Sequence, residues 1–133
     1  METEPAGMLR VLSVITEACA SLAGGTVLVC DDMDLHLHPR VTRWIAEQFA
    51  SGRNPNSAQL VASLSDTSLM DLKHLVRRDQ IYFTEKNGSG VSRLTCLSDF
   101  TGVRKDSDVQ KAYFGWKFGS LPNINSSEQL LRR

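Results

Sequence analysis

The sequence has few cysteines, no long apolar run and no signal peptide, the features that mark disulfide-rich, membrane and secreted proteins. Cysteine occurs only three times in 133 residues and never as a Cys-x-x-Cys pair, so neither a disulfide framework nor a zinc–cysteine site is indicated. No uninterrupted apolar run approaches the roughly 20 residues of a membrane span. The opening METEPAGMLR lacks the basic start and apolar stretch of a signal peptide. We therefore expect a cytoplasmic protein with reduced thiols and no membrane segment, with Cys19 and Cys30 in its core.

The chain also has no excess of either charge. Fifteen Lys and Arg residues balance 15 Asp and Glu residues, so the net charge of the chain does not attract nucleic acid or an anionic membrane. A local basic patch is left open. Apolar residues at 41% and charged residues at 23% are ordinary for a globular protein. The length suits one domain with a modest core. We expect this domain to cover residues 1–122, followed by a loose tail at 123–133.

Hydrophobic patterning predicts an α/β fold. The run at 26–30 is continuous and rich in β-branched residues, which is typical of a strand buried on both faces of a parallel sheet. Gly24 and Gly25 end the preceding helix, and Trp44 and Phe49 are expected in the core. The predicted elements are helices at 7–23, 39–50 and 106–113, strands at 26–30 and 59–63, a short helix ending at 72, and a β-hairpin of 79–85 and 91–97. The order of these elements indicates helices packed on a sheet.

The first predicted strand ends in an unusual cluster of charge, TVLVCDDMDLHLHP. Ligands bind outside the carboxyl ends of strands in open α/β sheets. A carboxylate there can hold Mg²⁺, and the next acidic residue can reach an attacking water. This pattern is a Walker B element with Asp31 on the magnesium side and Asp32 in the position of the catalytic base. The alternative, that both aspartates merely end a strand and cap the next helix, is equally compatible with the spacing.

His36 and His38 suggest a second chemistry. Together with Asp31, Asp32 and Asp34 they could hold a transition metal, since imidazole and carboxylate suit zinc, manganese or iron. Two histidines at i and i+2 converge on one metal only in an extended segment, whereas Pro39 and a helix follow here at once. A local role for His38, packing or hydrogen bonding at the turn before the helix, is the more economical interpretation.

Residues 27–39 resemble the Walker B and D-loop segment of ABC-type ATPases, the AAA-domain proteins of the RecF/SMC/OLD kind that are often linked to phage defence. Residues 59–71 resemble the switch segment of this family, and 77–86 resemble the strand after it. Residues 97–104 and 113–122 resemble the C-terminal end of such domains. The resemblance implies a partial P-loop NTPase sheet with flanking helices and a C-terminal β-hairpin, equivalent to the C-terminal half of the ATPase domain.

The same resemblance implies roles for individual residues. Asp31 would hold Mg²⁺, and Asp32 and Ser65, the latter at the position of the switch histidine, would be catalytic. Thr3, in the stretch where the signature sequence would lie, and His36 and His38 of the D-loop would contact ATP. The cofactors implied are Mg²⁺ and ATP, and the partners implied are a second copy of the chain and an effector nuclease. Contact with nucleic acid is left open.

Four departures from the family pattern affect this chemistry. No GxxxxGK[ST] phosphate loop occurs in the sequence. Pro5 replaces the signature glycine and has no amide hydrogen to donate. Asp32 replaces the usual Glu, and Ser65 replaces the switch histidine. We therefore expect that the chain does not hydrolyse ATP alone. Two explanations are left open: the chain is a truncated or decayed part of a longer ATPase, or another polypeptide supplies the phosphate loop.

Two rival hypotheses remain. One is a non-enzymatic interaction module that uses a sheet edge and the aromatic stretch 113–118, which we expect to be at least partly exposed. The other is a small metal-dependent hydrolase built on Asp31, Asp32, His36 and His38.

Overall fold

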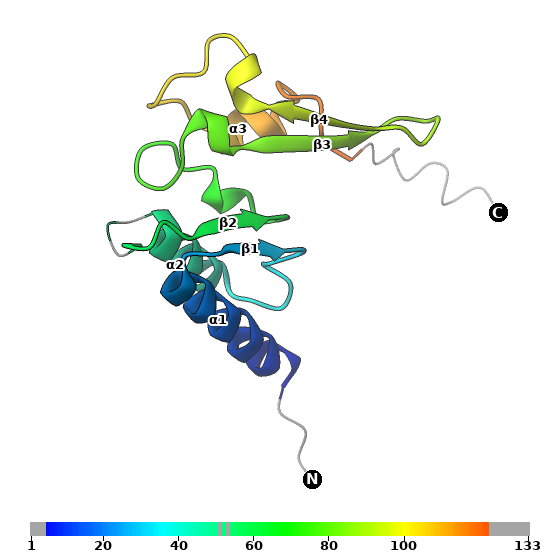
Figure 1. Ribbon diagram of the computed structural model, residues 1–133. Coiled ribbons are helices and arrows are strands. Elements are labelled where there is room, and N and C mark those ends of the chain that lie inside the picture. The colour runs from blue at the N-terminus through cyan, green and yellow to red at the C-terminus, as the bar shows by residue number, and fades with distance from the viewer. Residues whose placement is uncertain (1–4, 51, 53, 123–133) are drawn as a thin grey trace, which may run out of the picture. The chain divides into compact units, whose positions relative to one another are not determined.

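The computed structural model describes residues 5–50, 52 and 54–122 (Figure 1). The chain divides into two compact units, residues 1–76 and 77–133. The fold is mixed α/β, with one small parallel sheet and one small antiparallel sheet. The predicted α/β class is therefore confirmed, while the narrower P-loop NTPase architecture and the single domain over 1–122 stay predictions. The predicted tail at 123–133 lies outside the described residues.

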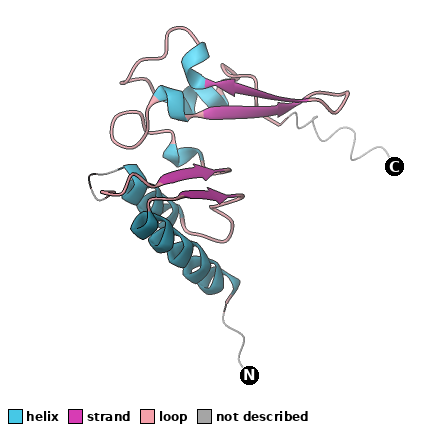
Figure 2. Ribbon diagram, in the orientation of Figure 1, coloured by secondary structure: helices cyan, strands magenta, loops and turns pink. Residues whose placement is uncertain are grey.

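The first unit is a two-stranded parallel sheet with helices packed on it (Figure 2). Its elements are α1 (Ala6–Gly24), β1 (Val27–Cys30), α2 (Pro39–Ala50), β2 (Gln59–Ala62) and the short 3-10 helix η1 (Thr67–Leu69). The parallel register pairs Val27 with Gln59 and Cys30 with Ala62. The predicted helices and strands of this unit are confirmed, although the last helix is one short 3-10 turn.

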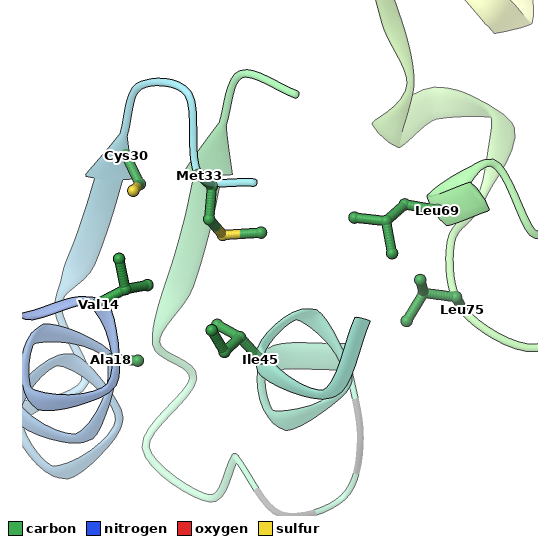
Figure 3. Packing of buried hydrophobic residues seen from close by; sticks show 7 residues of the cluster. All are labelled: Val14, Ala18, Cys30, Met33, Ile45, Leu69 and Leu75. Atoms are coloured by element: carbon green, nitrogen blue, oxygen red, sulfur yellow. The ribbon is translucent and has the colours of Figure 1, made fainter. Parts of the chain in front are cut away.

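The core of the first unit lies between the helices and one face of the sheet. Figure 3 shows side chains from α1, β1, α2 and the segment after β2 pointing into one space. The buried apolar residues of this cluster are Val14, Ala18, Cys30, Met33, Ile45, Leu69 and Leu75. Cys30 is buried as predicted. The cluster ties both helices to the sheet, so it positions the ends of both strands.

Three burial predictions fail. Cys19 is exposed because Val14, Ala18 and Ser21 form the inward stripe of α1. Trp44 is exposed because the next residue, Ile45, takes the inward position on α2; Phe49, by contrast, packs against the core. The sheet is not buried on both faces, since the side chains of Val27, Val29 and Val61 are exposed, with Val29 at 73%. The reason is that α1 and α2 cover only one face of this sheet within the first unit.

The second unit is built on an antiparallel β-hairpin. β3 (Tyr82–Lys86) pairs with β4 (Ser92–Cys96). The hairpin is confirmed, although β3 begins later than predicted because η2 (Arg78–Gln80) occupies the preceding residues. A second 3-10 helix, η3 (Leu97–Asp99), and the short helix α3 (Val109–Phe114) follow β4.

An aromatic cluster forms the core of the second unit. The ring of Phe83 stacks on Tyr113 at 5.6 Å and on Phe118 at 4.9 Å between centroids, and Phe100 meets it edge-on. Because of this packing, the aromatic stretch 113–118 is divided. Tyr113 and Phe118 turn inward, whereas Phe114 and Trp116 remain exposed. The predicted exposure of this stretch is thus confirmed for two of its four aromatic residues.

One helix approaches the properties of a membrane span. Within the described residues, the window Gly7–Gly24 of α1 is long and apolar enough by length and composition alone. A single weakly apolar helix near the N-terminus is weak evidence, because the core helices of soluble proteins pass the same test. Val14, Ala18 and Ser21 of α1 are buried in the first unit. A membrane span is therefore not supported, and the cytoplasmic location stays a prediction.

Candidate functional site

The acidic turn, residues 31–38, begins where β1 ends. Asp31 and Asp32 are exposed, whereas Met33 between them and Asp34 is completely buried and anchors the turn in the core. Asp32 and His36 have left-handed backbone conformations, with φ of 46° and 61°. Aspartate tolerates this conformation better than most residues. The turn is therefore held at a defined place, with its first two carboxylates facing solvent.

Ser63, directly after β2, joins both aspartates. Its hydroxyl donates a hydrogen bond to Asp31 Oδ1, and its Oγ accepts one from the backbone N–H of Asp32 at 2.7 Å. The backbone N–H of Met33 also donates to the carbonyl of Ser63 at 3.0 Å. These bonds exist because β1 and β2 are parallel, so their carboxyl ends lie side by side. Ser63 was not among the predicted site residues, although a hydroxyl directly after the neighbouring predicted strand was a usable signal.

Arg10 of α1 holds the acidic turn from another side. Its Nη2 donates to the carbonyl oxygens of Asp31 and Asp32, each at 3.0 Å, and lies 3.8 Å from the sulfur of Cys30. Burial raises the pKa of the Cys30 thiol, while Arg10 acts in the opposite direction. The net direction favours the neutral thiol at physiological pH, so Cys30 acts as a core residue. No sequence signal pointed to Arg10, because its partners lie 20–22 residues away.

Asp34 connects the acidic turn to the segment of the predicted switch. Its Oδ2 accepts hydrogen bonds from the backbone N–H groups of Ser65 at 2.9 Å and Asp66 at 2.7 Å. Asp66 in turn caps η1 by accepting from the N–H of Ser68, as the capping pattern of residues 65–68 predicted. The structure therefore brings Asp31, Asp32 and Ser65 to the same edge of the sheet.

The two histidines have different surroundings. His38 Nδ1 accepts a hydrogen bond from the backbone N–H of Arg40 at 3.2 Å, which confirms the predicted local role at the start of α2. His36 is exposed. Its backbone carbonyl oxygen lies close to Gly7 of α1, where an added Cβ would be only 3.0 Å from it. Among the described residues, no group of three or more His, Cys, Asp or Glu side chains is placed to hold a metal ion. Thr3 lies outside the described residues.

The carboxylates of the acidic turn are not neutralised by an ion pair within the described part of the chain. None of the four ion pairs between described residues involves Asp31, Asp32 or Asp34. The nearby cation, Arg10, is directed at backbone carbonyls instead. Three carboxylates within four residues, with one arginine beside them, make this edge of the sheet better suited to a cation than to a free phosphate.

The comparisons with known proteins give no independent guide to this site. No protein-family model, curated protein or solved structure matches the chain.

Proposed function

We propose that the first unit is the Walker B half of an ABC-type nucleotide site, which acts on Mg-ATP together with a phosphate loop from another polypeptide. The observation that carries the proposal is the pair Asp31 and Asp32 at the carboxyl end of β1, tied through Ser63 to the end of the neighbouring parallel strand. Ligand sites of open α/β sheets form at such strand ends.

Asp31 is the residue that we assign to the cation. Its Oδ1 accepts from Ser63, which orients the carboxylate and leaves Oδ2 to meet Mg²⁺ or a water bound to it. Magnesium commonly keeps several waters and takes one or two carboxylates, with phosphate oxygens completing its shell. This mode of binding needs no cluster of three protein ligands, so it agrees with the donor set of the acidic turn.

Asp32 and Ser65 are the residues that we assign to the chemical step. Asp32 would orient the attacking water, but it is one methylene shorter than the Glu of the family, and a misplacement of about 1 Å can cost on the order of a hundredfold in rate. Ser65 can donate a hydrogen bond to a transferring phosphoryl group, but unlike histidine it cannot carry a positive charge. We therefore propose slow turnover even in the completed site.

The need for a partner follows from two observations. These 133 residues contain no phosphate loop, so in this proposal the backbone amides and lysine that hold the β- and γ-phosphates come from residues outside them, which we assign to a partner. The parallel sheet has only two strands and exposes Val27, Val29 and Val61 on one face, whereas parallel sheets are normally covered on both faces. A cytoplasmic polypeptide that carries the phosphate loop and further strands, or a second copy arranged around it, would satisfy both needs.

Titration calorimetry with Mg-ATP tests the first part of the proposal. The isolated chain should bind Mg-ATP weakly or not at all, and micromolar binding with turnover would contradict the need for a partner. The second part needs the completed assembly, recovered from the host with a tagged chain. There, Asp31→Asn should abolish Mg-dependent hydrolysis while the matched variant Asp106→Asn, at an exposed carboxylate of the second unit, should not.

A non-enzymatic interaction module is the second candidate. The observation in its favour is the uncovered apolar face of the sheet, which would bury its valines against a partner protein. In that case the acidic turn is a relic, and Asp31→Asn should leave the affinity for the partner and every function of the complex unchanged. The same variant therefore separates the two candidates.

A further inference from the structure

The two units differ in charge, although the chain as a whole is neutral. Residues 1–76 contain five Lys and Arg against nine Asp and Glu, a net charge of −4, and residues 77–133 contain ten against six, a net charge of +4. Such an asymmetry between parts of one chain indicates a charged partner for one of them. The Walker B hypothesis concerns only the acidic unit and gives the basic unit no role.

Four cations of the second unit lie on α3, in the loop before it or just after it in the sequence. Lys117 Nζ would lie 4.0 Å from a Cβ at Gly102, which places this amine beside the loop that carries Arg104 and Lys105. None of the four ion pairs between described residues includes Arg104, Lys105, Lys111 or Lys117. Two carboxylates are close in sequence: Asp106 is exposed, and Asp108 is used as the N-cap of α3, where it accepts from the N–H of Lys111.

Two aromatic side chains close to these cations in the sequence are exposed. Phe114 ends α3 and is 58% exposed, and Trp116 follows it at 56%. Trp116 also has φ of 62°, which is an outlier for a bulky residue and costs about 1–2 kcal/mol. Backbone strain of this kind concentrates at functional positions. The side chain of Trp116 thus lies in solvent, although Phe118 of the aromatic core is only two residues further along the chain.

We infer that this surface, the α3 patch, binds single-stranded nucleic acid. It consists of Arg104, Lys105, Lys111, Phe114, Trp116 and Lys117. The cations match the phosphates of a flexible strand, and the two rings offer stacking platforms for its bases, whose faces are hidden in a duplex. An acidic peptide would contact the cations, but its carboxylates would not use the exposed ring of Trp116, on which a base can stack. An anionic membrane would need a larger apolar face than these two side chains provide.

Tryptophan fluorescence tests the inference directly. The chain has two tryptophans, so a Trp44→Phe background leaves Trp116 as the sole reporter. Titration with a 15-nucleotide oligo(dT) or oligo(U) in low salt should quench Trp116. With four phosphate contacts, the logarithm of the affinity should fall with the logarithm of the salt concentration with a slope of about −2.8. Lys117→Gln should make this slope shallower by about 0.7, because one phosphate contact is removed.

Two further variants separate stacking from charge, with a labelled oligonucleotide as the probe in the wild-type background. Trp116→Ala should weaken binding roughly 5- to 150-fold, the equivalent of one lost base stack. Trp44→Ala, which removes the exposed tryptophan of the acidic unit, is the matched control and should leave the affinity unchanged. Circular dichroism establishes that both variants remain folded.

Several results would overturn the inference. They are the absence of quenching at low salt, an unchanged affinity of Trp116→Ala, or tighter binding to phosphatidylserine vesicles or polyglutamate than to the oligonucleotide. None of these results bears on the Walker B proposal, since Asp31 and Asp32 lie in the other unit. Conversely, Asp31→Asn should leave oligonucleotide binding intact.

Discussion

Asp71 supports the most quantitative prediction that the structure allows. Its Oδ2 accepts from Arg43 Nη2 of α2 at 2.9 Å, and its Oδ1 accepts from the backbone N–H groups of Lys73 and His74. The His74 ring nitrogen also lies 3.1 Å from Oδ2. Burial acts to raise the pKa of Asp71, but these hydrogen bonds outweigh it and hold the pKa at about 2. The network thereby fastens the segment after η1 to α2.

The magnitude follows from the pKa of Asp71. A pKa nearly two pH units below the ordinary value corresponds to about 2.5 kcal/mol of folding free energy. The side chain is 24% exposed, so solvent screening reduces this figure, and we expect about 1.5–2 kcal/mol. Because the folded-state pKa is depressed, this stabilisation is fully present above about pH 5 and is lost as the pH falls from about 4 to about 2. Asp71→Asn should therefore lower the free energy of unfolding at pH 7 and have a much smaller effect near pH 2.

Urea denaturation measures this effect. In a Trp116→Phe background, Trp44 on α2 reports on the first unit alone, and the unfolding free energies of the wild-type residue and Asp71→Asn are compared at pH 7 and at the lowest pH at which the chain stays folded. Asp79→Asn is the matched control, because it removes the carboxylate of an exposed ion pair with Arg77 in the second unit. A loss below about 0.5 kcal/mol at pH 7, or an equal loss at both pH values, would refute the assignment of the stabilisation to the Asp71 charge.

Three other substitutions test particular contacts. Ser63→Ala should speed hydrogen exchange of the Asp32 amide, followed by NMR, and lower the free energy of unfolding by about 1 kcal/mol, whereas Ser63→Thr keeps the hydroxyl and should restore protection. Unchanged exchange in the Ala variant would contradict the bridging role of Ser63. Gly25→Ala should lower the free energy of unfolding by about 2–4 kcal/mol, measured in thermal melts followed by circular dichroism. The reason is that φ is 64° and the added Cβ would lie 2.5 Å from the carbonyl oxygen of Asn56. Gly88→Ala, where the space is open, is the control and should be nearly neutral. Phe118→Ala should cost about 3–5 kcal/mol in urea unfolding of the second unit, read from Trp116 in the Trp44→Phe background; a loss below 1 kcal/mol would show that the aromatic cluster is not the core of this unit.

The local elements were predictable because local patterns specify them. The bounds of α2 were predicted correctly to the residue, since Pro39 suits a first helical turn and the apolar spacing continues to Ala50. Gly25 adopts the left-handed conformation that ends α1. The hairpin turn was visible as a glycine-rich stretch, and its Asn87 carbonyl and side chain accept the N–H groups of residues 89–91. In each case the determining contacts lie within a few residues along the chain.

The failures concern how the elements face one another. A continuous apolar run cannot tell whether a second layer covers a strand, so Val29 was wrongly expected to be buried. Cys19 and Trp44 were misplaced because each helix has a broad apolar arc, and only the position of the sheet decides which part of it turns inward.

The sequence by itself determined that Asp31 and Asp32 follow a short apolar strand, that a second strand of the same kind comes about thirty residues later, and, to within one residue, where α1 and α2 begin and end. Only the tertiary structure decided that both strands run side by side in parallel, which brings Ser63 to the two aspartates and Arg10 to the backbone of the acidic turn. These contacts join residues 20–32 positions apart. Chain folding, rather than any local pattern, determines which residues at such separations meet.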